Sequence, residues 1–157
     1  LSSKFLLEQI KKNNFPITIL RLYLVYGPKQ DLNRLIPITI MNALKKVKFN
    51  CSAGKQLRDF IYIDDLVNAI VKTFKNKKSN GEIINVGSGN PISVKKLIIK
   101  ICKLANGGKP QFGKVSLRKD EILKLYPSLN KVKKILNWQA KVNLDKGLKK
   151  TIKYYNN

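Results

Sequence analysis

Histidine is absent from this 157-residue chain, cysteine occurs only twice, and acidic residues number 9 against 32 lysines and arginines. Because histidine is missing and Cys51 and Cys102 are isolated, the sequence offers neither a CxxC pair nor a Cys/His zinc site. Isolated cysteines are typical of proteins kept in a reducing compartment. No apolar run reaches the roughly 18 residues of a membrane-spanning helix, and no signal-peptide pattern opens the given sequence. We therefore expect a cytoplasmic protein without a metal site or a membrane partner.

The excess of basic residues gives a formal net charge of +23. Such a charge is common in nucleic-acid binders, because lysine and arginine neutralise phosphates. Only four of the basic residues are arginines, however, whereas nucleic-acid sites favour the bidentate contacts that arginine makes. The lysines are scattered along the chain, and no aromatic stacking motif runs among them. We therefore do not expect nucleic acid as the partner, and we attribute the charge to a lysine-rich surface around an anionic ligand.

The four arginines are notable in a chain that otherwise uses lysine. They are Arg21, Arg34, Arg58 and Arg118. A guanidinium presents a planar fork of hydrogen-bond donors that matches a diphosphate or a carboxylate. The arginines are therefore candidates for contacting an anionic ligand.

Strands and helices alternate along the chain, which predicts an α/β fold. Apolar periodicity predicts helices at 2–13, 35–46, 66–74, 94–105, 129–136 and 144–155. Apolar runs predict strands at 17–22, 60–63 and 82–86, with extended segments at 49–51 and 111–117. The first strand is nearly all apolar, as expected in a parallel sheet buried on both faces, and Tyr26 begins the turn that closes it. Asp64 and Ser93 are the predicted N-caps of the helices that follow them.

Three sequence blocks carry a resemblance to a known family. They are RLYLVYGP at 21–28, RDFIYIDDL at 58–66 and GEIINVGSG at 81–89. In this order they resemble the C-terminal half of the extended short-chain dehydrogenases/reductases, the NAD-dependent epimerase/dehydratases that modify nucleotide sugars. The resemblance implies the C-terminal portion of a Rossmann-type fold, with the last parallel strands and a small α/β substrate-binding subdomain. The implied Rossmann elements are residues 1–28 and 82–106, and the implied subdomain comprises mainly 29–81 and 107–157.

The resemblance also implies a catalytic residue. The family motif is Tyr-x-x-x-Lys, in which the lysine lowers the pKa of the tyrosine and holds the nicotinamide ribose. The residues around Lys4 resemble the later part of this motif, so Lys4 is the expected catalytic and cofactor-binding lysine. Taken alone, Lys4 would be interpreted as an ordinary surface lysine. The tyrosine would precede Leu1, and the missing half would bind most of the cofactor, NAD or NADP.

The block at 21–28 resembles the family's R-x-x-N-V-Y-G-P, a strand end that lies beneath the nicotinamide. Leu22 and Val25 are accordingly expected to contact the cofactor. Leu24 replaces the family's asparagine, which contacts the sugar nucleotide. Because leucine forms no side-chain hydrogen bond, the polar detail of the sugar site is expected to differ here.

Further residues are implied in binding the nucleotide. Arg34 and Leu35 belong to a segment whose backbone lines the family's nucleotide pocket. Cys51 lies in an extended stretch that would flank the base. These residues would form the base-binding part of the substrate site.

The diphosphate and ribose are assigned to a second group of residues. Arg58 and Arg118 would each contact the diphosphate through charge-assisted hydrogen bonds. Glu121 would hold the vicinal hydroxyl groups of the nucleotide ribose. The other interpretation of Arg58 is a structural ion pair with Asp59 or Asp65.

A glycine-containing turn at 87–89 invites comparison with phosphate-binding loops. It lacks the third glycine and the following lysine of a P-loop. We therefore interpret it as a strand-to-helix turn.

The resemblance implies an NAD(P)-dependent nucleotide-sugar epimerase, dehydratase or reductase, of which this chain is the nucleotide-sugar-binding half. The segment at 51–60 looks closest to deoxysugar reductases of surface polysaccharides. We expect a nucleotide-diphosphate sugar as partner and an isolated chain that is inactive. A homo-oligomer is expected too, because the truncation would expose apolar surface and a strand edge. The alternative function is a non-catalytic module that binds sugar nucleotides or polyanions in general.

Overall fold

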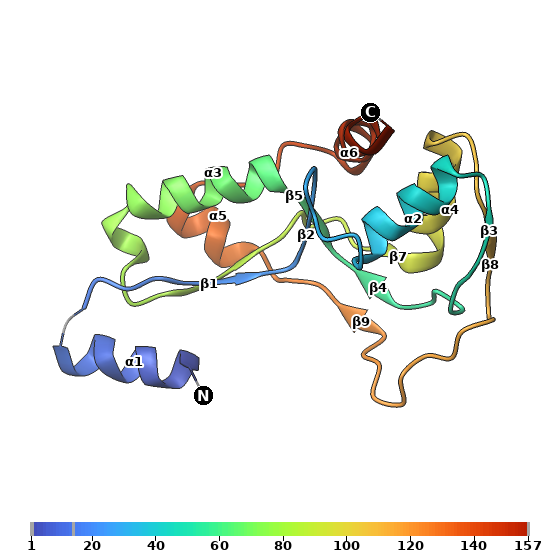
Figure 1. Ribbon diagram of the computed structural model, residues 1–157. Coiled ribbons are helices and arrows are strands. Elements are labelled where there is room, and N and C mark those ends of the chain that lie inside the picture. Colours follow the sequence, from blue (N-terminus) through green and yellow to red (C-terminus); the bar gives the residue numbers. More distant parts are fainter. Residues whose placement is uncertain (1, 14, 157) are drawn as a thin grey trace.

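The computed structural model describes residues 2–13 and 15–156, and it shows helices and short strands alternating along the chain (Figure 1). The helices are α1 (Ser2–Asn13), α2 (Leu35–Leu44), α3 (Ile63–Phe74), the 3-10 helix η1 (Lys77–Ser79), α4 (Val94–Leu104), α5 (Asn130–Leu136) and α6 (Leu144–Asn156). The strands are β1 (Ile19–Leu22), β2 (Leu24–Tyr26), β3 (Lys48–Asn50), β4 (Leu57–Arg58), β5 (Phe60–Tyr62), β6 (Ile83–Val86), β7 (Ile92–Ser93), β8 (Lys109–Gln111) and β9 (Lys124–Leu125). All six helices predicted from periodicity are confirmed, with ends that differ by up to three residues.

The strands pair mainly in parallel, as the apolar run of the first strand predicts. β1 pairs with β6, β2 with β5, and β3 with β8, all in parallel. β4 lies between β7, to which it is antiparallel, and β9, to which it is parallel. The fold is thus of the α/β class, with parallel strands connected by helices.

The predicted turn after this extended segment is confirmed, because β2 ends at Tyr26 and a turn follows at Pro28 and Lys29, but the segment is not a single strand. The extended backbone continues through β2, but it changes partner at Tyr23. The Tyr23 N–H donates to the Val86 carbonyl, whereas the Leu24 N–H donates to the Asp59 carbonyl. Because a strand that leaves one partner for another has no sequence signal of its own, apolar periodicity did not reveal β2.

β5 contributes to two apolar cores because successive side chains of a strand point to opposite faces. Ile61 is fully buried in a core that also contains Val86 of β6 and Trp138. Phe60 and Tyr62 pack instead into a second core, which includes residues of α2, α4 and α6. Figure 1 shows the corresponding arrangement, with α3 and α5 on one side of β2 and β5 and with α2 and α4 on the other.

The start of α3 differs from the prediction. Asp64 is not the N-cap, because β5 runs directly into the helix and Tyr62 occupies the cap position without a side-chain hydrogen bond. Asp64 is exposed in the first turn, and its carboxylate accepts a hydrogen bond from Lys150 at 3.3 Å. The predicted cap at Ser93 is confirmed, since its hydroxyl accepts a hydrogen bond from the Lys96 N–H at 3.2 Å.

α1 lies beneath β1 and apart from the other helices (Figure 1). Its Phe5 side chain is 60% exposed, and Phe15, just after the helix, is 57% exposed. The N-terminal region therefore presents apolar side chains to solvent.

Within the described part of the chain, no helix has the length and apolar character needed to cross a membrane.

Candidate functional site

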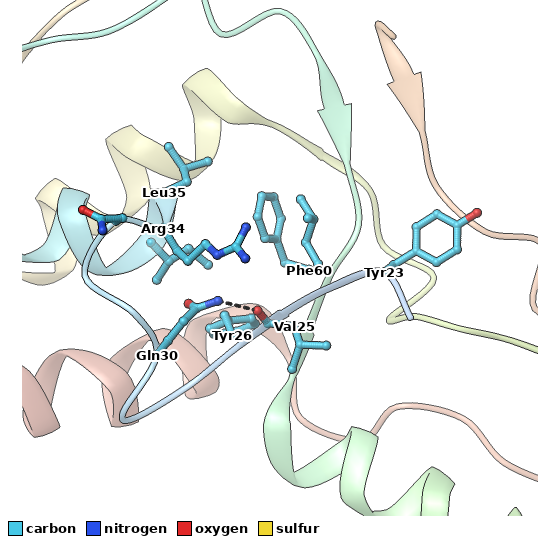
Figure 2. A pocket seen from close by; sticks show the side chains of 10 residues that line it. Tyr23, Val25, Tyr26, Gln30, Arg34, Leu35 and Phe60 are labelled. Carbon is cyan, nitrogen blue, oxygen red and sulfur yellow. Dashed lines mark hydrogen bonds between the residues drawn. The ribbon is translucent and has the colours of Figure 1, made fainter. Parts of the chain in front are cut away.

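A cavity of about 530 Å³ lies where β2 leads into α2 (Figure 2). It is lined by Tyr23, Leu24, Val25, Tyr26, Gln30, Asn33, Arg34, Leu35, Ile36 and Phe60. Three residues singled out in the sequence, Val25, Arg34 and Leu35, are thereby brought to one place. From the sequence, Val25 was expected to contact the cofactor, and Arg34 and Leu35 were expected to contact the nucleotide. The structure places residues of both expected sites around one cavity.

Arg34 supplies the cationic group of this cavity. It occupies the N-cap position of α2, and the preceding turn is held by the Arg34 N–H, which donates to the Asp31 carbonyl at 3.0 Å. Figure 2 shows its guanidinium extending across the cavity in the direction of Phe60. Among the described residues no carboxylate forms an ion pair with it. A cation without an internal counter-charge is suited to an anionic ligand.

The N-terminus of α2 adds to the positive potential of the cavity. The Arg34 side chain makes no capping hydrogen bond to the helix, and the first two helical residues, Leu35 and Ile36, line the cavity. The third, Pro37, has no N–H. The first N–H groups of a helix lack intrahelical acceptors and carry the positive end of the helix dipole. The arrangement of Arg34 next to this helix end is therefore typical of an anion-binding site.

Gln30 is a cavity residue that sequence reasoning missed. Its Nε2 donates to the Val25 carbonyl at 2.8 Å, which fixes the orientation of the amide. Its Oε1 is buried and has no hydrogen-bond partner in the described chain. A glutamine four residues after a buried tyrosine carries no sequence signal of this role.

Arg58 and Glu121 form a second polar group. Arg58 Nη2 donates to the Glu121 carboxylate, and Nη1 donates to the Leu57 carbonyl at 2.8 Å. The two charged side chains are only 11% and 23% exposed. The predicted alternative, an ion pair of Arg58 with Asp59 or Asp65, is wrong, because the carboxylates of both aspartates accept backbone N–H groups elsewhere.

The Asp59 carboxylate holds the turn at 87–89 through hydrogen bonds. Its carboxylate is completely buried and accepts the Ser88 N–H at 2.6 Å and the Gly89 N–H at 2.7 Å. A side chain at Gly87 would overlap Pro127 and approach the same carboxylate. The N–H groups that resemble a phosphate loop are therefore occupied by a carboxylate of the chain itself, which supports the interpretation as a strand-to-helix turn.

Cys51 and Arg118 lie outside the cavity at α2. The Cys51 side chain is buried with Phe49, Val94 and Ile98, and burial raises the pKa of its thiol. Arg118 is exposed in the segment between β8 and β9, where its carbonyl accepts the Glu121 N–H at 3.2 Å. Arg118 and Glu121 are thus close in the backbone, whereas Cys51 faces a core.

The other two residues assigned to the cofactor also lie outside the cavity. Lys4 is exposed on α1, and Leu22 ends β1 with its side chain 48% exposed. Neither is a lining residue of the cavity that contains Val25.

Comparison with known proteins identifies relatives of this chain. Residues 2–87, more than half of the chain, match the NAD dependent epimerase/dehydratase family. CDP-abequose synthase of Salmonella muenchen is 33% identical over 135 residues, which cover 85% of this chain and 46% of that protein. UDP-glucuronate 4-epimerase of Thermodesulfobacterium geofontis is 33% identical over 141 residues, which cover 88% of this chain and 42% of the relative.

A solved structure shows the same fold. UDP-glucuronic acid 4-epimerase from Bacillus cereus, in complex with UDP-glucuronic acid and NAD, superposes with a TM-score of 0.86 at 29% identity. The match covers 98% of this chain and 49% of that one. The fold is therefore the Rossmann-type fold of the extended short-chain dehydrogenases, and the chain spans about half the length of the relatives it matches. From the family match and the shared fold, we conclude that this chain belongs to the NAD dependent epimerase/dehydratase family.

Proposed function

We propose that this chain is the nucleotide-sugar-binding, C-terminal part of an NAD- or NADP-dependent nucleotide-sugar epimerase, dehydratase or reductase. The observation that carries the proposal is the pairing of Arg34 with the uncapped N-terminus of α2 at one cavity. Family membership supports it, and so does the match to an enzyme whose structure contains UDP-glucuronic acid and NAD.

The chemistry of the cavity fits the anionic part of a nucleotide sugar. A guanidinium and the free N–H groups of a helix end both stabilise phosphate oxygens. Leu24 and Phe60 provide apolar surface beside them. A nucleoside diphosphate linked to a sugar has the matching features, because its charged phosphates lie next to less polar atoms.

Arg58, Arg118 and Glu121 are proposed as the second part of the substrate site. Arg58 ends β4, two residues before Phe60 of β5, which lines the cavity. Arg58 and Arg118 would contact phosphate oxygens, and Glu121 would accept hydrogen bonds from ribose hydroxyls. Cys51 would contribute its backbone to this site, since its side chain is buried in a core.

The residues proposed for the cofactor are compatible with a nicotinamide nucleotide. Lys4 offers an exposed ammonium group that can donate to ribose hydroxyls, and Leu22 and Val25 offer apolar surface for a nicotinamide ring. NAD or NADP would supply the hydride acceptor. Lys4 would hold the ribose and lower the pKa of a tyrosine supplied by the other half.

Self-association is proposed from the exposed apolar surface of the N-terminal region. Phe5 and Phe15 are each more than half exposed, and such groups tend to be covered by a partner. Sedimentation velocity at rising protein concentration should show a species larger than the monomer. A monomer at every concentration would contradict the proposal.

The proposed location is the cytoplasm.

The alternative proposal is a non-catalytic module that binds polyanions in general, which the net charge of +23 favours. The two proposals differ in salt dependence. General polyanion binding weakens steeply as salt rises, because it is driven by the release of counterions. Recognition of one nucleotide sugar depends instead on a few placed groups.

The test is calorimetric titration of the chain with UDP-glucuronic acid, CDP-glucose and dTDP-glucose, and with heparin as the general polyanion. We expect one of the sugar nucleotides to bind and Arg34→Gln to weaken that binding roughly tenfold or more, since one charge-assisted contact contributes about 1.5–3 kcal/mol. Arg21→Gln is the matched control, because this exposed arginine lies on β1 outside the cavity. Equal losses in both variants, or binding of heparin alone, would favour the polyanion module.

A further inference from the structure

The C-terminal helix α6 contacts the wall of the cavity at both of its ends, although none of its residues lines the cavity. At its start, the Leu144 carbonyl accepts a hydrogen bond from Tyr26 Oη at 3.4 Å. At its end, Tyr155 Oη donates to the Gln30 carbonyl at 2.7 Å. Tyr26 and Gln30 both line the cavity (Figure 2), so α6 contacts two residues of its wall.

The contact at Tyr155 is the stronger one, and it reaches the loop that carries Arg34. Within this loop, the Asn33 N–H donates to Asp31 Oδ1 at 2.9 Å and the Arg34 N–H donates to the Asp31 carbonyl. These bonds fix the shape of the loop, and the bond from Gln30 Nε2 to the Val25 carbonyl ties it to the neighbouring strand β2. Among the described residues, the hydrogen bond that joins loop 27–34 to a distant part of the chain comes from Tyr155.

Tyr155 is suited to act as a permanent donor. Burial raises the pKa of its phenol, and the neighbouring Tyr154 raises it further, so the hydroxyl stays protonated at neutral pH. The ring also packs against the core formed by α2, α4 and α6. A donor fixed by packing can hold its acceptor in place at little entropic cost.

We propose that Tyr155 is a positioning residue, which holds the Gln30–Arg34 segment so that the Arg34 guanidinium stays over the cavity. Its action on a ligand rests on the proposed function, since Arg34 is the group that contacts the anion. Without the hydroxyl, the loop loses its link to α6, and Arg34 samples orientations that do not bind.

Tyr155→Phe tests this proposal, because it removes the hydroxyl and keeps the packed ring. We expect the affinity for the sugar nucleotide that binds the unaltered chain to fall roughly 3- to 10-fold, as the loss of one hydrogen bond implies. Tyr154→Phe is the matched control. That ring is 42% exposed and lies at 5.1 Å from the Tyr155 ring, and its hydroxyl makes no hydrogen bond in the described structure.

A double-mutant cycle separates positioning from general stabilisation. If Tyr155 acts through Arg34, Tyr155→Phe causes no further loss of affinity in a chain that already carries Arg34→Gln. Additive losses would overturn the proposal, since the hydroxyl would then affect the ligand independently of the guanidinium.

Hydrogen exchange without ligand tests the link itself and does not depend on the ligand class. The backbone amides of residues 30–34 should exchange faster in Tyr155→Phe than in the unaltered chain or in Tyr154→Phe. Equal exchange in all three would overturn the proposal. Faster exchange in a chain that binds no sugar nucleotide would uphold the link and refute the proposed function instead.

Discussion

At the level of single residues, the buried carboxylate of Asp59 is stabilised by hydrogen bonds from the backbone. Its carboxylate has no solvent exposure, and two backbone N–H groups of the turn at Ser88 and Gly89 satisfy it. A buried ionised group is costly unless hydrogen bonds replace its hydration. The carboxylate therefore ties the junction of β4 and β5 to the turn that follows β6.

Asp59→Asn should destabilise the fold, because an amide presents only one acceptor oxygen to two N–H donors and turns its own NH₂ toward one of them. We expect a loss of about 1–3 kcal/mol in the free energy of unfolding, measured by urea denaturation. Asp145→Asn is the control, since this exposed aspartate pairs with Lys100 at the surface, where such pairs contribute little. Equal losses in the two variants would show that the turn does not depend on the Asp59 charge.

Ionisation of Tyr26 should lower the stability of the folded chain at alkaline pH. Burial raises the pKa of its phenol above the ordinary value of 10.0, and Tyr62 and Asp65 raise it further. In the unfolded chain this phenol ionises near pH 10, whereas in the folded chain it remains protonated. Its contribution is therefore complete below pH 10 and is lost progressively as the pH rises above it.

The prediction is measured as the difference in unfolding free energy between the unaltered chain and Tyr26→Phe. As the pH rises above about 10, this difference should shift in favour of the phenylalanine variant, by up to about 1.4 kcal/mol per pH unit. The comparison of two chains removes the effect of lysine titration, which they share. Parallel pH profiles would contradict the assignment.

At the scale of elements, α6 packs against β2 and β5 through a glycine. A Cβ at Gly147 would overlap the Tyr26 hydroxyl and lie 3.0 Å from the Tyr62 ring. These two rings meet edge to face, with centroids 5.6 Å apart. Glycine at this position allows the helix to come close enough for the contact between Tyr26 and Leu144.

Gly147→Ala therefore sets two effects against each other. Helix propensity favours alanine by about 0.5–1 kcal/mol, but overpacking against buried rings costs about 1–3 kcal/mol. We expect net destabilisation, measured by thermal or urea denaturation. Lys149→Ala, at an exposed position of the same helix, should leave stability nearly unchanged. A more stable Gly147→Ala chain would mean that α6 can move away from the rings.

At the scale of the whole molecule, charge repulsion opposes folding. The formal net charge is +23, and in the described residues four acidic side chains form ion pairs. Salt screens repulsion between exposed charges, with a Debye length of about 10 Å at 0.1 M. A compact chain with this excess of lysine should consequently be more stable in salt.

We predict that the melting temperature rises as NaCl increases from about 10 mM to about 300 mM, where the Debye length falls well below the size of the domain. Each 1 kcal/mol of stabilisation corresponds to about 2–4 °C in a chain of this length. A variant with Lys134→Glu and Lys149→Glu, both exposed, should show a smaller rise because its net charge is lower. A melting temperature independent of salt would refute the repulsion argument.

The fold class, the positions of the helices and the family could all be predicted from the amino-acid sequence. Helices could be predicted because amphipathic periodicity is local, and the family could be recognised because its motifs are contiguous. Arg34, Leu35 and Val25 were assigned to two different ligands, and their meeting in one cavity was not foreseen.

Contacts between residues that are far apart in the sequence could not be predicted in this way. Glu121 reaches Arg58 across 63 positions, and Tyr155 reaches Gln30 across 125. The change of partner that creates β2 likewise depends on where β5 and β6 lie, and the burial of Cys51 depends on residues of α4. Contacts of this kind are set by the packing of distant elements, which leaves no periodic or contiguous signal in the sequence.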